Sequence, residues 1–184
     1  MEKSMRKLTV EELHRLDAES FRMARKLPLA IVLDNIRSQH NVGSVFRTAD
    51  AFRVSELLLC GITAVPPSSD IHKTALGAED AVKWSYWPDT LQAVRHLQAA
   101  GYVVLSVEQV EGSSKLDSYR FDENRRYALV LGNEVKGVSQ SVVDASDGAL
   151  EIAQYGTKHS LNVSVTAGIV MWEAERQLGA CLKG

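Results

Sequence analysis

Short, uninterrupted apolar runs recur along this chain, and segments with helical periodicity separate them. A strand that is buried on both faces is apolar throughout, and two parallel strands need a crossover, which is usually a helix. The alternation therefore predicts an α/β fold with a mostly parallel sheet and helices on both of its faces. Strands are expected at 29–33, 57–60, 103–107, 127–131 and 150–153, with a weaker candidate at 82–86.

Capping signals place the helices between these strands. Thr9-Val10-Glu11-Glu12 is a capping-box pattern that predicts a helix to about Lys26, before Pro28 breaks it. Asp89 and Ser139 are further candidate N-caps. Because no repeat or linker interrupts the pattern, we expect one globular domain over 29–184, preceded by a helical extension over 1–28. The expected helices are 9–26, 42–53, 89–100, a short one after 139 and a long one from about 161.

The composition is that of an ordinary globular protein, with 45% hydrophobic and 24% charged residues. No apolar run could span a bilayer, the charged N-terminus is not a secretory signal, and Cys60 and Cys181 lie far apart. These features predict reduced thiols and a cytoplasmic location. The histidines have no metal-ligand spacing, so we expect no metal site. The net charge of −2 argues against a broad basic surface for nucleic acid, but not against a local one.

Three common ligand-binding signatures are absent from the sequence: the dinucleotide fingerprint GxGxxG, the phosphate loop GxxxxGK[ST] and the nucleophile elbow GxSxG. Ligands of open α/β sheets usually bind beyond the carboxyl ends of the strands. The site is therefore expected in the loops that follow Leu33, Val107, Leu131 and Ile152.

The first of these loops leads into a helix whose polar residues share one face. Asn41, Ser44 and Arg47 are three residues apart, and an apolar stripe that starts at Val42 lies on another face. Gly43 would leave the first turn uncovered by a side chain. A bare helix start with an arginine one turn further on suits an anionic group such as phosphate. A capped amphipathic helix with an exposed arginine explains the pattern equally well.

Small and polar residues also mark the loops after 131 and 152. Gly132-Asn133-Glu134 and Gly137 follow a buried strand, and the glycines suggest a backbone that turns tightly and approaches a ligand. A plain strand-to-helix turn uses similar residues. Ser160 and Asn162 precede a helix that is expected to be buried all round. They are either caps or polar groups at the edge of a core, where such groups need partners.

Together these stretches resemble the three ordered motifs of the SpoU/TrmH family, which are RNA 2′-O-ribose methyltransferases of the SPOUT class. The resemblance spans roughly 29–176, and it departs from the family at Ala153, where a proline is common. The motifs are Asn41-x-Gly43-x-x-x-Arg47-Thr48, Leu131-Gly132-Asn133-Glu134-x-x-Gly137 and Ser160-Leu161-Asn162-Val163-Ser164-Val165.

The resemblance implies a deep C-terminal trefoil knot, which is an exception to the usual rules of topology. It also implies a homodimer with the C-terminal helix at the interface. The implied cofactor is S-adenosylmethionine, held in the knot mainly by backbone atoms. The residues expected to bind it are Val107, Leu131, Gly132, Asn133, Gly137, Ile152 and Leu161.

Methyl transfer to a ribose 2′-hydroxyl is the implied reaction, with Arg47 at the catalytic position. A guanidinium holds its proton strongly, so we expect Arg47 to grip an RNA phosphate and stabilise the developing alkoxide, while the proton leaves to phosphate or water. Asn41 would fix Arg47 or the ribose, and Glu134 would orient the basic site. Ser160 and Asn162 would hold the third loop and the nucleotide in register. RNA contacts are expected from Ser44, Arg47, Arg22, Arg25 and Lys26.

The expected substrate is tRNA, modified on a guanosine of the D-loop, because Val107-Glu108-Gln109 resembles members with that target. The stretch 1–26 is also too short for the added RNA-binding domain of many ribosomal-RNA members. Ribosomal RNA is the alternative substrate. The intact motifs argue against a non-catalytic knotted RNA-binding module. The missing phosphate-loop signatures argue against an unrelated nucleotide-dependent α/β enzyme.

Overall fold

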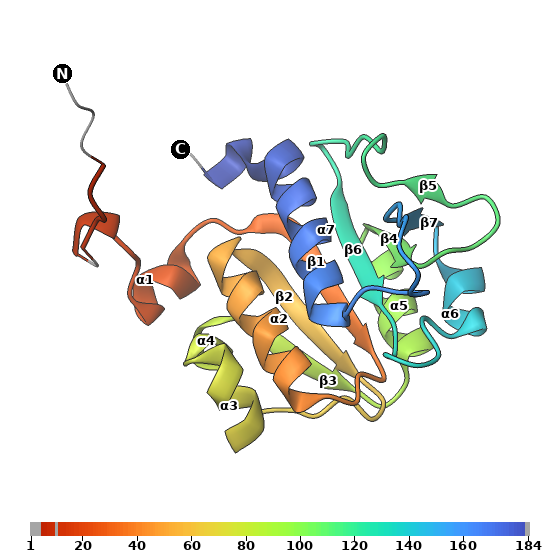
Figure 1. Cartoon of the computed structure of the whole chain (residues 1–184), viewed down its shortest axis with the longest axis horizontal. Coiled ribbons are helices and arrows are strands. Elements are labelled where there is room, and N and C mark those ends of the chain that lie inside the picture. Colours follow the sequence, from red (N-terminus) through yellow and green to blue (C-terminus); the bar gives the residue numbers. More distant parts are fainter. Residues whose placement is uncertain (1–4, 10, 183–184) are drawn as a thin grey trace.

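A seven-stranded sheet forms the centre of the molecule in the computed structural model, which describes residues 5–9 and 11–182 (Figure 1). The strand order is β3-β2-β1-β6-β4-β7-β5, and each of these pairings is parallel. The predicted parallel α/β sheet is therefore confirmed. The strands are β1 (Leu27–Asp34), β2 (Val54–Cys60), β3 (Trp84–Trp87), β4 (Tyr102–Val107), β5 (Ser114–Lys115), β6 (Arg126–Leu131) and β7 (Gly148–Glu151).

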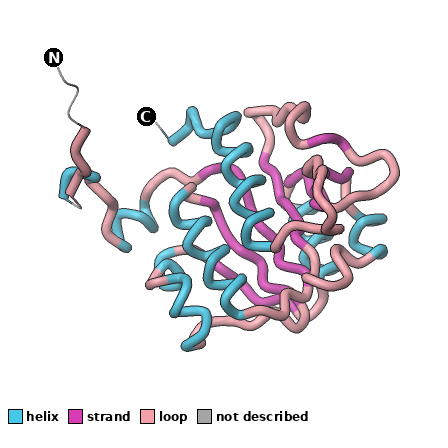
Figure 2. Tube along the Cα trace, viewed as in Figure 1, coloured by secondary structure: helices cyan, strands magenta, loops and turns pink. Residues whose placement is uncertain are grey.

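Helices cover both faces of this sheet (Figure 2). On one face, α2 (Gln39–Ala51) and α7 (Val163–Leu178) pack on alternate residues of β1 such as Leu29 and Ile31. On the other face, α5 (Thr90–Ala99) and α6 (Gln140–Ala145) pack on the intervening residues such as Ala30 and Val32. The two faces explain why the central strands are apolar without interruption.

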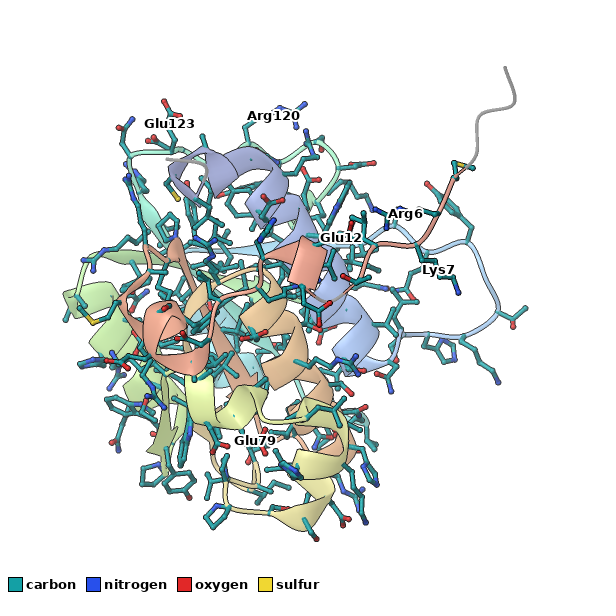
Figure 3. The ribbon with its side chains drawn as sticks, turned by 90° about the vertical axis from the view of Figure 1, so that its left-hand side faces the viewer. Arg6, Lys7, Glu12, Glu79, Arg120 and Glu123 are labelled. Carbon is teal, nitrogen blue, oxygen red and sulfur yellow. The ribbon has the colours of Figure 1, made fainter. Side chains whose placement is uncertain are left out.

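The prediction of one continuous N-terminal helix over 9–26 is wrong. The capping box forms, because Thr9 N donates to Glu12 Oε2 at 2.8 Å and Glu12 N donates to Thr9 Oγ1 at 3.4 Å. Only a 3₁₀ turn, η1 (Glu11–Leu13), follows it, since His14 adopts a left-handed φ of 47°. Asp17 then caps the separate helix α1 (Ala18–Met23). Figure 3 shows Arg6 beside Glu12 in this segment, and the two side chains form an ion pair of 2.6 Å.

Two short helices between β2 and β3 were not predicted: α3 (Ser69–Ala75) and α4 (Ala78–Ala81). Ser68 caps α3 by accepting from Ile71 N, and both helices contact α2. A short 3₁₀ turn, η2 (Gly179–Leu182), follows α7. No helix among the described residues is long and apolar enough to cross a bilayer.

The C-terminal helix α7 differs from its prediction in one respect. It begins at Val163, after Asn162, whose side chain accepts from Ser164 N at 2.8 Å. Its expected burial on all sides is wrong, because Val165 is 50% exposed and Trp172 is 54% exposed. One face of α7 therefore packs on the sheet, and another carries Val165 and Trp172, each about half exposed.

Candidate functional site

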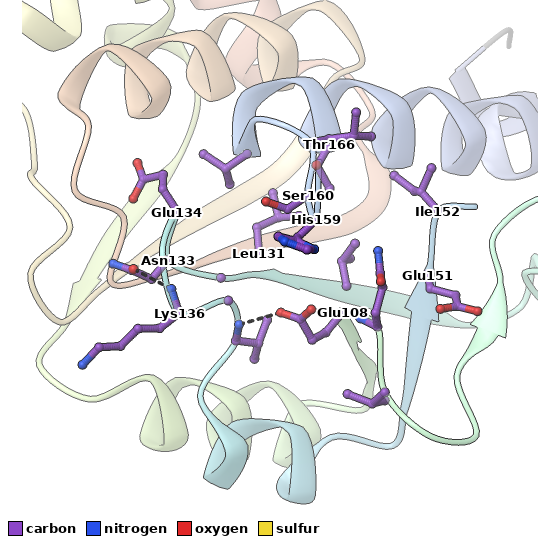
Figure 4. A pocket seen from close by; sticks show the side chains of 18 of the residues that line it. Glu108, Leu131, Asn133, Glu134, Lys136, Glu151, Ile152, His159, Ser160 and Thr166 are labelled. Atoms are coloured by element: carbon purple, nitrogen blue, oxygen red, sulfur yellow. Dashed lines mark hydrogen bonds between the residues drawn. The ribbon is translucent and has the colours of Figure 1, made fainter. Parts of the chain in front are cut away.

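A cavity of about 670 Å³ lies at the carboxyl edge of the sheet, where the loops after β4, β6 and β7 meet (Figure 4). This is the place that the sequence indicated. Every residue expected to bind the cofactor lines the cavity, although their binding of it stays a prediction. These residues are Val107, Leu131, Gly132, Asn133, Gly137, Ile152 and Leu161.

The loop after β6 folds back on itself. Asn133 and Gly137 exchange two backbone hydrogen bonds, with N–O distances of 3.0 and 2.8 Å, and Gly137 has a φ of 67°. A Cβ on Gly132 would lie 2.1 Å from the carbonyl carbon of Gly137 and from Val138 N. The predicted tight turn is therefore confirmed. The close approach that Gly132 permits, however, is to the loop's own backbone.

A chain of hydrogen bonds joins the three motifs beside this cavity. Glu134 accepts from the backbone N–H groups of Arg37 and Ser38 at 2.9 and 3.0 Å, and from Asn41 Nδ2 at 3.1 Å. Asn162 Nδ2 in turn donates to Asn41 Oδ1 at 3.2 Å. Asn41 thus connects the second motif to the third.

Glu134 is held as a carboxylate by these bonds. Burial alone would raise its pKa, but the hydrogen bonds from the Arg37 and Ser38 amides, its own amide and Asn41 together hold the pKa of Glu134 below its ordinary value. The start of α2 therefore already carries an anion that belongs to the protein. This corrects the expectation that the helix start is bare and suited to an external phosphate.

Gly43 also has a different role from the one predicted. It is buried, and a Cβ at this position would lie 2.1 Å from Thr74 Oγ1 and 2.3 Å from the backbone oxygen of Ile71. The missing side chain lets α3 pack closely against α2, so Gly43 does not present backbone to a ligand. The predicted faces of α2 are otherwise confirmed, with Val42 buried and Arg47 exposed.

Arg47 and Ser160 are the two predicted catalytic residues outside this chain of hydrogen bonds. Arg47 is exposed on α2, and Ser160 is exposed on the loop that lines the cavity. Within the described part of the chain, neither side chain makes a hydrogen bond or an ion pair. Asn41 therefore makes no hydrogen bond to Arg47 here, and its expected contact with the ribose stays a prediction. Ser44, one turn before Arg47, donates to the backbone oxygen of His40 at 2.8 Å.

The basic residues predicted near the N-terminus lie elsewhere. Arg22, Arg25 and Lys26 belong to α1 and the turn after it, and none of them lines the cavity. Arg22 Nη2 donates to the backbone oxygen of Asp80 at 2.9 Å, and Lys26 Nζ lies 3.5 Å from the ring centroid of Phe21. Their binding of RNA stays a prediction.

Two acidic residues at strand ends were not assigned to the site from the sequence. Glu108 follows β4, lines the cavity and accepts from Val138 N at 2.9 Å, which ties the loop after β6 to the end of β4. Asp34 ends β1, is 1% exposed and accepts from Thr90 Oγ1 at 2.6 Å and from Ser139 N at 3.1 Å. The sequence feature that could have identified both residues is an acidic residue placed directly at the end of an apolar strand.

The lining of the cavity fits the expected cofactor. Its volume is within the usual range for cofactor sites, about 300–1,000 Å³. Apolar side chains such as Leu131 and Ile152 can contact an adenine ring, and the carboxylates of Glu108 and Glu134 suit a cationic ligand better than a polyphosphate. Among the described residues, no group of three or more His, Cys, Asp or Glu side chains could hold a metal ion.

A parallel α/β sheet with a cavity at its carboxyl edge is typical of α/β proteins that bind a ligand beyond the ends of the strands. Within this class, the chain belongs to the SpoU rRNA Methylase family, whose model matches residues 28–172. The resemblance drawn from the three motifs is thereby confirmed.

Individual relatives act on two kinds of RNA. The chain is 32% identical to a tRNA (guanosine(18)-2′-O)-methyltransferase of Thermus thermophilus, over 90% of this chain and 84% of the relative. It is 29% identical to the 23S rRNA (guanosine-2′-O-)-methyltransferase RlmB of Vibrio vulnificus, over 91% of this chain but 66% of that protein.

Solved structures show the same fold. The TM-score is 0.77 to the TrmH/SpoU tRNA modifying enzyme of A. aeolicus, at 26% identity and with 89% of this chain and 83% of that one covered. The TM-score to an AdoMet-bound rRNA methyltransferase of Sinorhizobium meliloti is 0.76, at 28% identity. This match covers 86% of this chain and 60% of that one.

Proposed function

We propose that this protein transfers the methyl group of S-adenosylmethionine to a ribose 2′-hydroxyl of a structured RNA. The observation that carries the proposal is the Asn162–Asn41–Glu134 chain of hydrogen bonds, which places all three motifs beside one cavity. The preferred target is a guanosine in the D-loop of tRNA. The Thermus relative, named for tRNA guanosine 18 and covered over 84% of its length, supports this choice. A cytoplasmic location suits such a substrate.

The cavity residues would bind the cofactor, which supplies an electrophilic methyl group when it is bound. Backbone atoms at Gly132, Ile152 and Leu161 would hold the adenosyl part. Leu131 and Val107 would flank it, and the Asn133–Gly137 hairpin would form one wall of the pocket. This loop needs no ligand to hold its shape, because Asn133 Oδ1 also accepts from Val135 N and Lys136 N at 2.9 and 3.1 Å.

Arg47 would act on the RNA. Its side chain is exposed and has no described partner, so its five N–H donors are available to a phosphate. A guanidinium bound to the phosphate next to the target ribose would also stabilise the developing alkoxide. Glu134 and Asn41 fix the start of α2, and they would thereby position Arg47 without touching it. Ser160 and Asn162 would keep the third loop and the nucleotide in register.

Three larger features belong to the same proposal. Residues 29–184 would form the methyltransferase domain, and 1–28 would form an extension that contributes Arg22, Arg25 and Lys26 to RNA binding. The C-terminal segment would pass through a loop as a deep trefoil knot. Two observations support that threading. The loops after β6 and β7 line one cavity, and α7, which follows them, packs on β1 and β6.

The protein would work as a homodimer built on α7. Val165, Ile169 and Trp172 lie on one stripe of this helix, and the first and last of them are half exposed. An apolar stripe of this kind on an exposed helix face is typical of an interface. A second chain that covered it would also bring a second basic extension near the bound RNA.

Transfer of labelled methyl groups tests the function. Purified protein and labelled S-adenosylmethionine are incubated with total tRNA and, separately, with ribosomal RNA, and the products are digested to nucleosides. We expect label on a 2′-O-methylguanosine from tRNA. A substrate with 2′-deoxyribose at the target should still bind, because phosphate contacts dominate affinity, but should accept no methyl group. Label on a base would contradict the proposal.

A ribosomal substrate is the second candidate. Several relatives named RlmB match this chain, including one from Nitrosomonas europaea at 35% identity over 81% of this chain and 56% of that protein. Label that enters ribosomal RNA alone would select this second substrate. It would leave ribose methylation intact and remove the preference for tRNA.

A further inference from the structure

The proposed reaction leaves open which group removes the proton of the ribose hydroxyl. Arg47 is a poor acceptor, because a guanidinium keeps its proton at any working pH. An efficient base needs a pKa near the operating pH and a place within reach of the reacting hydroxyl. The titratable residues that line the cavity come from three loops, and they are Glu108, Glu134, Lys136, Glu151 and His159.

The acidic groups among them are already engaged. Glu134 accepts three hydrogen bonds, which hold its pKa low. Glu151 pairs with Lys115, and this bond lowers the pKa of Glu151. Glu108 uses one carboxylate oxygen for Val138 N and the other for Gln109 N, each at 2.9 Å. Each of these three carboxylates therefore already has partners within the protein.

His159 differs from these groups in both chemistry and position. Histidine is the commonest general acid–base group in enzymes, because an imidazole nitrogen can accept a proton. His159 precedes Ser160 on the third-motif loop, three residues before Asn162, which bonds Asn41. Figure 4 shows the side chains of His159, Ser160 and Glu134 among those that line the cavity. No described residue forms a hydrogen bond or an ion pair with the ring.

We propose that His159 is the general base that accepts the proton of the ribose 2′-hydroxyl. This inference rests on the proposed function. The O–H bond breaks as the new O–CH₃ bond forms, and the methyl group leaves sulfur, which keeps the electron pair of the old S–CH₃ bond. The proton goes to an imidazole nitrogen of His159 and then to solvent, since the ring is exposed. Arg47 stabilises the oxygen anion during the transfer.

The kinetic test compares His159→Gln with His96→Gln. His96 is an exposed histidine on α5 that contacts the Trp87 ring and does not line the cavity, so its variant is a matched control. We expect His159→Gln to lower kcat at pH 7 by about 100-fold, as loss of a general base does. The KM for S-adenosylmethionine should stay unchanged. The wild-type rate should rise and level off across neutral pH, and the variant rate should keep rising.

Two further measurements separate a base from a structural residue. Added imidazole should restore part of the rate of His159→Ala and should leave His96→Ala unaffected. In carbon-13 NMR of histidine-labelled protein, S-adenosylhomocysteine should shift the His159 signal and leave the His96 signal in place, which places the ring at the cofactor without any turnover.

Three outcomes would overturn the inference. They are an unchanged pH profile in His159→Gln, a loss confined to the KM for the cofactor, and an absence of rescue by imidazole in a variant that still binds cofactor. An inactive wild-type protein would instead contradict the proposed function itself. The two failures are thus distinguishable in one set of assays.

Discussion

At the scale of single residues, the carboxylate of Glu134 joins the second motif to the first. Its carboxylate accepts from two backbone amides at the start of α2 and from Asn41. Glu134→Gln keeps the shape but puts an N–H₂ group where an acceptor is needed. We expect the free energy of unfolding to fall by about 1–3 kcal/mol, the usual cost of unsatisfied partly buried donors. Denaturant titration measures it, with the exposed Glu123→Gln as the control that should change little.

The same residue gives a prediction for pH. The pKa of Glu134 is lower in the folded protein than its ordinary value of 4.5, so the carboxylate stabilises the fold above that pH. This contribution is lost as the pH falls through the folded pKa. The stability gap between wild type and Glu134→Gln should therefore be constant near neutral pH and shrink on acidification below about pH 4.5. A gap that widens in acid would contradict the assignment.

Arg47 should matter for chemistry and not for the fold. Its side chain is exposed and forms no hydrogen bond or ion pair with the described residues, so Arg47→Ala should leave the melting temperature within about 2 °C, as neutral surface changes do. Activity should fall at least 100-fold, while calorimetry shows unchanged cofactor binding. Arg47→Lys should also be poor, because an ammonium cannot reproduce the bidentate fork. Wild-type turnover in either variant would rule out the role.

At the scale of elements, the contact between α2 and α3 depends on Gly43. A Cβ there meets Thr74 Oγ1 at 2.1 Å and the Ile71 backbone oxygen at 2.3 Å, and a backbone atom cannot turn away. Gly43→Ala should therefore destabilise the protein by about 1–3 kcal/mol, as overpacking does. Gly156→Ala is the matched control, because nothing lies within 4 Å of its added carbon. Thermal unfolding of both variants checks this, and equal stability would contradict the packing role.

The elements also show what the sequence could reveal. The strands were predictable because burial on both faces leaves an uninterrupted apolar run, as in β6. The cavity was predictable because parallel strands end at one edge. The role of Gly43 was not, since it depends on α3, a short polar helix without a periodic signal. The bond between Asn41 and Glu134 joins residues 93 positions apart, and no local pattern encodes such a contact.

At the scale of the whole molecule, the half-exposed apolar stripe of α7 bears on how many chains assemble. Val165 and Trp172 are two turns apart and are 50% and 54% exposed, while the opposite face of the helix packs on the sheet. A second copy of the chain suits this stripe, because self-association through α7 would remove the stripe of each chain from water at once. The proposed homodimer therefore depends on this face.

A charge on that stripe should separate the two chains. Trp172→Glu places a carboxylate where the dimer would bury it without a partner, which is costly, whereas an isolated chain keeps it in water. Sedimentation equilibrium should give a dimer for wild type and a monomer for Trp172→Glu, with the near-native circular dichroism of a folded chain. Ile62→Lys, on a residue that is 67% exposed in the loop after β2, should remain a dimer. A wild-type protein that sediments as a monomer at micromolar concentration would contradict the α7 interface, and RNA methylation by that monomer would show that the site needs no second chain.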